Sequence, residues 1–159
     1  MNDFSIRPAT RSDLPALGRL GAALMRLHYQ FDPKRFMAPP DRPEDGYAWF
    51  LGTQLDADDA VILVAHHDDV ILGYVYAAIE PDSWKELRER CGYVHDVLVD
   101  PEARRQGVAS TLMNAAFDWL KSHGMPRVVL GTASANVAAQ RLFAQLGFRP
   151  TMIEMTREL

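Results

Sequence analysis

Residues 97–112 read VLVDPEARRQGVASTL and form the most informative segment of the chain. An apolar strand runs into Asp-Pro, a turn carries two arginines, a glutamine and a glycine, and a helix begins at once. The first N–H groups of a helix have no partner within it, and the helix dipole adds positive partial charge at that end. The order of strand, basic turn and helix therefore predicts a binding site for a diphosphate.

The residues of this turn suit an anion in different ways. Gly107 lets the backbone approach a ligand closely, and Ala109 keeps the next turn slim. Arg104 and Arg105 add fixed positive charge suited to phosphate. Neither the P-loop pattern G-x-x-x-x-G-K-S/T nor the dinucleotide pattern G-x-G-x-x-G is present, so neither of these two nucleotide-binding motifs explains the turn.

The segments on either side of this stretch predict a mixed α/β chain. Apolar periodicity gives, in order, a strand at 4–7, helices at 12–28 and 44–55, strands at 60–65, 70–79 and 93–99, a helix at 107–122, a strand at 127–131, a helix at 136–146 and one or two strands in the tail at 148–157. Antiparallel pairing comes first and βαβ-like units follow. We therefore predict a mixed, mostly antiparallel central sheet of six to seven strands with about four helices on its faces.

Composition narrows the classes of function. The 159 residues fit one domain spanning 1–159, and the apolar fraction of 48% can fill its core. The net charge of -4 argues against a nucleic-acid partner, and no apolar run is long enough for a membrane span. The polar N-terminus is unlike a signal peptide, and a single cysteine, Cys91, argues against a disulfide or a Cys-rich metal site. We expect a cytoplasmic protein without a metal.

Two segments together resemble the GNAT superfamily of N-acetyltransferases. The turn from Arg104 to Ala109 matches its acetyl-CoA signature Q/R-x-x-G-x-G/A, with Gly107 in the central place. Residues 136–148, NVAAQRLFAQLGF, resemble its later motif N-x-x-A-x-x-L/F-Y/F-x-x-x-G-F. The opening IRPAT at 6–10 and the element order are also similar. The resemblance implies the GNAT fold and an acyltransferase enzyme that uses acetyl-CoA as co-substrate.

The resemblance also implies where coenzyme A lies. The strand at 93–99 would splay from the strand at 127–131, with the pantetheine arm bonded between them to the backbone near 97–99. A bulge there would aim an N–H at the thioester oxygen. The cofactor-binding residues implied are Val97, Leu98, Val99, Arg104, Arg105, Gln106, Gly107, Val108, Ala109, Ser110, Asn136, Ala139 and Phe143.

His95 is the first candidate for the catalytic base. In some family members a Glu at this position helps to deprotonate the amine, and a histidine with a pKa of about 6.5 suits the same task. Asp96 is a second candidate, for acceptor binding. Strict strand alternation puts His95 and Asp96 on opposite faces, with Asp96 beside Val94. Either residue could instead have a purely structural role in the strand.

Phe143 departs from the family pattern, because many members have a Tyr there that protonates the leaving thiolate. Tyr93, Tyr74 and Tyr76 are the candidate replacements. If none acts, the alternative is a non-catalytic coenzyme-A-binding regulatory or interaction module. The expected partner is an amine acceptor, a small molecule or a protein, and net acidity favours a cationic one. Dimers are common in the family, so a homodimer is expected.

Overall fold

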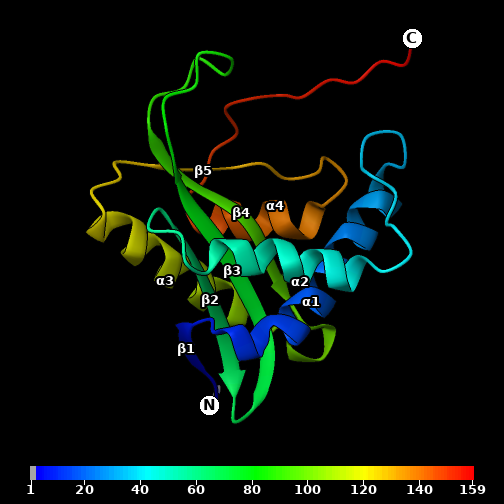
Figure 1. The fold of residues 1–159 in the computed structure, drawn as a ribbon. Helices are drawn as coiled ribbons and strands as arrows, with labels where there is room; N and C mark the ends of the chain where they lie inside the picture. The colour runs from blue at the N-terminus through cyan, green and yellow to red at the C-terminus, as the bar shows by residue number, and fades with distance from the viewer. Residues whose placement is uncertain (1–2) are drawn as a thin grey trace.

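A five-stranded sheet forms the centre of the computed structural model, which describes residues 3–159 (Figure 1). The strands lie side by side in chain order: β1 (Ser5–Pro8), β2 (Ala60–His67), β3 (Val70–Glu80), β4 (Cys91–Val99) and β5 (Val128–Leu130). Neighbours are antiparallel except β4 and β5, which are parallel. Four α-helices flank the sheet: α1 (Leu14–Phe31), α2 (Pro43–Gln54), α3 (Val108–Ser122) and α4 (Val137–Gln145). This confirms the predicted mixed, mostly antiparallel architecture.

The predicted count of six to seven strands is wrong, because the C-terminal tail forms none. Residues 148–159 are extended and pair with no strand of the described chain, and they run away from β5 (Figure 1). The tail side chains Met152, Ile153 and Met155 are 82%, 84% and 88% exposed. Alternation predicted a strand here, but a strand forms only where a second backbone edge satisfies its hydrogen bonds.

Two apolar cores lie on opposite faces of the sheet. The first packs α3 against the sheet through Val108, Leu112, Met113, Ala116 and Leu120. The second packs α1 and α2 against the other face through Leu17, Leu20 and Leu51. Alternate residues of β2 and β3 supply both cores, since successive side chains of a strand point to opposite faces.

β4 changes phase at a bulge, which decides the orientation of the candidate catalytic residues. Ala77 pairs with Val94 and Tyr76 pairs with Asp96, so His95 is the extra residue. Val94 belongs to the α3 core, whereas Asp96 bonds to a side chain of α2. The prediction that Val94 and Asp96 share a face is therefore wrong, because one inserted residue reverses the alternation.

Asp13 fixes the start of α1 against β1. Its buried carboxylate accepts hydrogen bonds from the Arg7 guanidinium at 2.7 and 3.0 Å and from the Thr10 amide at 2.8 Å. Thr10 and Asp13 also form a reciprocal capping box around a short 3-10 turn. The Arg7 hydrogen bonds, more than any other contact, lower the pKa of Asp13.

We expect Asp13→Asn to lower the free energy of unfolding by about 1–2 kcal/mol at neutral pH. The pKa of Asp13 in the folded protein lies below its value of about 3.9 in the unfolded chain. The ionised Asp13 carboxylate therefore stabilises the fold above about pH 3.9, and this stabilisation is lost as pH falls through the lowered pKa. Chemical denaturation at pH 7 and pH 3 measures the difference between variant and parent. A difference that stays constant down to pH 3 would rule out the ionised carboxylate as its source.

Candidate active site

β4 and β5 separate after three residues and open a cavity between them. Pairing joins residues 92–94 to residues 128–130, and no described strand pairs with β4 on this side from His95 onward. This opening is the splay that the family resemblance implies. A cavity of about 70 Å³ lies at the separation, lined by Leu24, His28, Val94, His95, Asp96, Val97, Leu130, Gly131, Thr132, Asn136, Ala139 and Phe143.

Six of the sixteen predicted site residues meet at this cavity. Those that line it are His95, Asp96, Val97, Asn136, Ala139 and Phe143. Tyr93 lies beside it, and its ring stacks on His95 with centroids 4.6 Å apart. Leu98, Val99 and the turn at 104–110 lie outside the cavity, along the continuation of β4 into α3. The bulge expected near 97–99 is found earlier, at His95.

The turn after β4 gives α3 an N-terminus without a side-chain cap. Gly107 is the N-cap residue at a φ of 81°, and no side chain of the described chain caps the helix. Thr111 donates its hydroxyl to the Gly107 carbonyl at 2.9 Å. The Thr111 side chain therefore does not bond to the first backbone amides of α3. Arg105 adopts a left-handed φ of 62°, which is uncommon for a residue with a side chain. The arrangement fits an anion held by backbone amides.

Several of the predicted cofactor residues also have structural partners. Arg104 donates from Nε to the Val99 carbonyl at 3.3 Å and so ties the turn to the end of β4. Asn136 accepts from the Ala139 amide at 3.2 Å and caps α4. Phe143 is buried and meets Phe148 edge-on, with centroids 5.9 Å apart.

Asp96 brings a carboxylate into the cavity. The Tyr47 and Tyr74 hydroxyls donate to its Oδ2 atom at 2.9 and 3.0 Å. Oδ1 has no hydrogen-bond partner among residues 3–159, and Asp96 lines the cavity. Burial raises the pKa of Asp96, and the hydrogen bonds from the two tyrosines oppose that rise. The carboxylate is therefore held in place while one oxygen stays free for a ligand.

The sequence did not single out Tyr47, although its position has a local cause. A Cβ atom built on Gly21 of α1 would lie 2.0 Å from a ring carbon of Tyr47, so only glycine admits this ring. Gly18 allows the same close approach of α2, with Glu44 and Ala48 beside it. Gly18 and Gly21, three residues apart in α1, were the feature of the sequence that could have indicated this close approach of α2. Burial raises the pKa of Tyr47, so its hydroxyl stays protonated and donates.

His95 lies between two aromatic rings and is oriented by a carboxylate. Its ring stacks on Tyr76 with centroids 5.0 Å apart, and on Tyr93 at the other side. Nε2 lies 2.7 Å from Oε1 of Glu80. In the tautomer that donates from Nε2 to Glu80, Nδ1 holds a lone pair that can take a proton. A base oriented by a third group is the arrangement expected of an acid–base site.

Tyr93 supplies a hydroxyl near the cavity wall. A Cβ atom built on Gly131, which lines the cavity, would lie 3.6 Å from the Tyr93 hydroxyl oxygen. Burial is the largest cause of a raised pKa for Tyr93, so the group carries its proton at neutral pH. Tyr93 can therefore donate a proton there, which Phe143 cannot.

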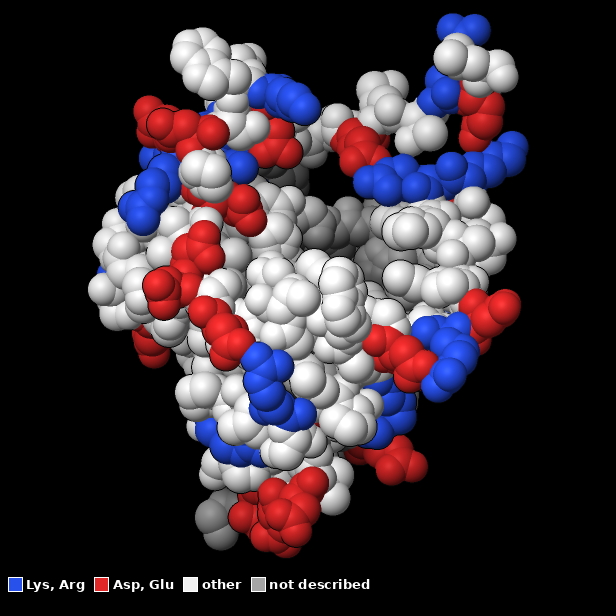
Figure 2. All heavy atoms as spheres, viewed as in Figure 1, with Lys and Arg blue, Asp and Glu red and all other residues white. Residues whose placement is uncertain are grey.

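The surface carries charges of both signs. Acidic and basic side chains are both present on the face shown in Figure 2, with a row of basic side chains near its upper right edge and a cluster of acidic ones at the bottom. Within residues 3–159, no group of three or more His, Cys, Asp or Glu side chains could hold a metal ion. None of the helices in that range is long and apolar enough to cross a membrane. The expectations of no metal, no membrane and no nucleic-acid partner stay predictions.

The chain belongs to the acetyltransferase (GNAT) family, whose model matches residues 22–148. A mycothiol acetyltransferase from Thermomonospora curvata is 32% identical over 114 residues, which cover 68% of this chain and 36% of the relative. Human N-acetyltransferase 8 is 31% identical over 88 residues, which cover 55% of this chain and 38% of the relative. The chain thus spans little more than a third of the length of these relatives.

Solved structures share the fold at low identity. An aminoglycoside N-acetyltransferase, AAC(6')-Iy, in complex with CoA has a TM-score of 0.75 at 22% identity, covering 98% of this chain and 94% of its own. A transcriptional regulator from Bacillus halodurans has a TM-score of 0.76 at 22% identity, covering 98% and 99%. These likenesses confirm the predicted GNAT-like fold.

Proposed function

We propose that this chain is an N-acetyltransferase that moves an acetyl group from acetyl-CoA to a primary amine of a small molecule or protein. One juxtaposition carries the proposal: His95 and Asp96 line the cavity where β4 leaves β5, and the same strand runs on to the bare N-terminus of α3. The names of relatives, mycothiol and aminoglycoside acetyltransferases, support acyl transfer. We propose further that it acts as one domain over residues 1–159, in the cytoplasm and without a metal.

The residues present fit coenzyme A at two points. The uncapped amides after Gly107, with Val108, Ala109 and Ser110, would hold the diphosphate beside the charges of the turn. The open edge of β4 at 97–99 would bond the pantetheine arm as an added strand does, and α4 would line its other side. When bound there, acetyl-CoA supplies an acyl group activated as a thioester.

The acceptor amine must lose a proton before it reacts. With a pKa of about 10.4, roughly one lysine-like amine in 2,500 is neutral at pH 7. Oδ1 of Asp96 would accept a hydrogen bond from the ammonium and hold it at the cavity. Nδ1 of His95 would take the proton, while Glu80 acts as a positioning residue that keeps the ring oriented and stabilises its charged form. Tyr93 would return a proton to the leaving sulfur.

A second candidate function is favoured by Phe143. This side chain is only 7% exposed, lines the cavity and has no hydroxyl where many family members have one. A coenzyme-A-binding regulatory or interaction module without turnover needs no proton donor there. The two functions differ in whether Tyr93 replaces the missing hydroxyl.

Thiol release from acetyl-CoA in the presence of an amine panel separates the two functions. The panel comprises a polyamine, an aminoglycoside and a lysine-containing peptide, and we expect release that depends on at least one of them. CoA binding without release for any amine would support the non-catalytic module. Absence of both binding and release would refute both functions.

We expect Arg105→Glu to weaken CoA binding about tenfold, because it reverses a charge beside the diphosphate site. Isothermal titration with CoA measures the dissociation constant. Arg19→Glu makes the same charge change on an exposed position of α1, on the opposite face of the sheet, and should alter the constant less than about twofold. Equal effects from the two variants would show that only the net charge matters.

A further inference from the structure

A histidine of α1 lines the candidate active site and has no part in the steps described above. His28 lines the same cavity of about 70 Å³ as Asp96. Its Nδ1 atom lies 2.9 Å from the Leu24 carbonyl oxygen, one turn earlier in the helix. Because a carbonyl oxygen only accepts hydrogen bonds, Nδ1 carries the proton, and in the neutral ring Nε2 holds the lone pair.

The ring of His28 is held in place by aromatic contacts. Phe31 meets it edge-on with centroids 5.7 Å apart, and Phe36, in the loop after α1, with centroids 5.0 Å apart. Nε2 has no hydrogen-bond partner among residues 3–159, so it is the ring nitrogen that remains available to a ligand. An acceptor on a ring that is already fixed loses little freedom when a ligand binds.

Three acceptor atoms of the cavity match the three donors of a primary ammonium group. Oδ1 of Asp96 and Nδ1 of His95 serve the amine in the proposed function, and Nε2 of His28 is the third acceptor. His28 is within electrostatic reach of Asp96: burial raises the pKa of Asp96, and a charge on His28 is one of the smaller effects that oppose the rise. A primary ammonium has three N–H donors, whereas a secondary ammonium has two.

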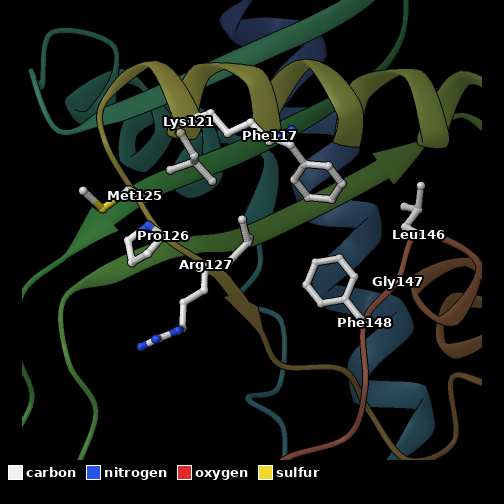
Figure 3. Close-up of a pocket in the computed structure, with 10 residues that line it drawn as sticks. Phe117, Lys121, Met125, Pro126, Arg127, Leu146, Gly147 and Phe148 are labelled. Carbon is white, nitrogen blue, oxygen red and sulfur yellow. The ribbon is translucent and has the colours of Figure 1, made fainter.

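The larger groove beside β5 offers no comparable set of acceptors. It measures about 260 Å³, and the rings of Phe117 and Phe148 line it with centroids 5.8 Å apart (Figure 3). Its charged lining residues are Lys121 and Arg127, which are both cations. No carboxylate or imidazole of the described chain lines this groove, so it repels an ammonium group.

We propose that His28 is a specificity-determining residue of the acceptor site, whose Nε2 atom accepts the third N–H of a primary ammonium and so favours primary over N-methylated amines. The inference rests on the proposed function, which places the ammonium between Asp96 and His95. A secondary amine brings a methyl group to Nε2 and leaves this acceptor without a partner, which costs binding free energy.

Steady-state kinetics at pH 8, above the ordinary histidine pKa of about 6.5, tests the role of His28. In the parent, the KM for butylamine should be about tenfold lower than the KM for N-methylbutylamine. His28→Phe keeps an aromatic ring beside Phe31 and Phe36 but has no acceptor. It should raise the KM for butylamine about tenfold, change kcat less than about twofold and remove the preference. His28→Gln, whose amide oxygen still accepts, should retain most of the preference.

His123→Phe is the matched control. Nδ1 of His123 lies 2.8 Å from the Trp119 carbonyl oxygen, also four residues earlier, but His123 does not line the cavity. This variant should leave both KM values unchanged. Loss of the preference in both phenylalanine variants, or a lower kcat at unchanged KM in His28→Phe, would overturn the inference. Circular dichroism checks that the variants remain folded.

NMR of the imidazole nitrogens separates this inference from the proposed function, because it needs no turnover. In the presence of CoA, the His28 ring should be the Nδ1–H tautomer, and butylamine should shift its Nε2 resonance but not that of His123. An Nε2–H tautomer, or no shift with butylamine, would overturn the role of His28. A shift without thiol release from acetyl-CoA for any amine would support the amine site and refute acetyl transfer.

Discussion

Replacing His95 with alanine should lower kcat about 10²–10⁴-fold and leave the dissociation constant of CoA within about twofold. The ring occupies the bulge of β4, lines the cavity and lies 2.7 Å from Glu80, and on this geometry we propose that it removes a proton from the amine. It contributes nothing to the amides of α3. Steady-state kinetics with the best amine of the panel, combined with titration of CoA, measures both quantities.

Glu80→Gln provides the matched test of positioning. The amide keeps a hydrogen bond to Nε2 but removes the negative charge, so kcat should fall, by less than in His95→Ala, while the dissociation constant of CoA stays unchanged. An unchanged kcat in Glu80→Gln would leave Glu80 with a structural role only. An unchanged kcat in His95→Ala would remove His95 from the mechanism.

Replacing Asp96 with asparagine should raise the KM for the acceptor about 10–100-fold without destabilising the protein. The amide oxygen still accepts from Tyr47 and Tyr74, but the charge that we propose holds the ammonium is gone. Because burial raises the folded pKa of Asp96, the ionised carboxylate destabilises the native state. This penalty is absent below the unfolded pKa of about 3.9 and grows as pH rises through the folded pKa.

Thermal unfolding therefore gives a second readout for Asp96. The Tm of Asp96→Asn should equal or exceed that of the parent at pH 7, and the gain should vanish near pH 3. Asp118→Asn, an exposed position on α3, removes the same charge without these contacts and should change neither KM nor Tm. A variant with normal KM and a lower Tm would make Asp96 a structural residue.

The order of elements could be predicted because each signal is local. The apolar strand before Asp100, the turn to Gly107 and the periodicity of α3 all lie within one stretch of chain, and each was found where expected. The lining of the cavity by Asn136, Ala139 and Phe143 followed from the resemblance of one short segment. Local patterns therefore predicted where the strand, turn and helices lie that we propose hold the cofactor.

The acceptor side depends on contacts between distant segments, which local patterns do not contain. Tyr47 meets Asp96 across 49 positions of sequence, through a ring that fits only over Gly21. The bulge at His95 reverses the alternation of β4 and cannot be seen in the apolar run itself. For the same reason the tail was expected as a strand of its own sheet, although its pairing depends on an available edge.

Titration of the folded chain with CoA is the most direct test of the central claim, that the turn before α3 and the open edge of β4 hold this molecule. The account predicts saturable heat with one CoA bound per chain, and weaker binding to Arg105→Glu. No heat with either CoA or acetyl-CoA, from protein that circular dichroism shows to be folded, would contradict it.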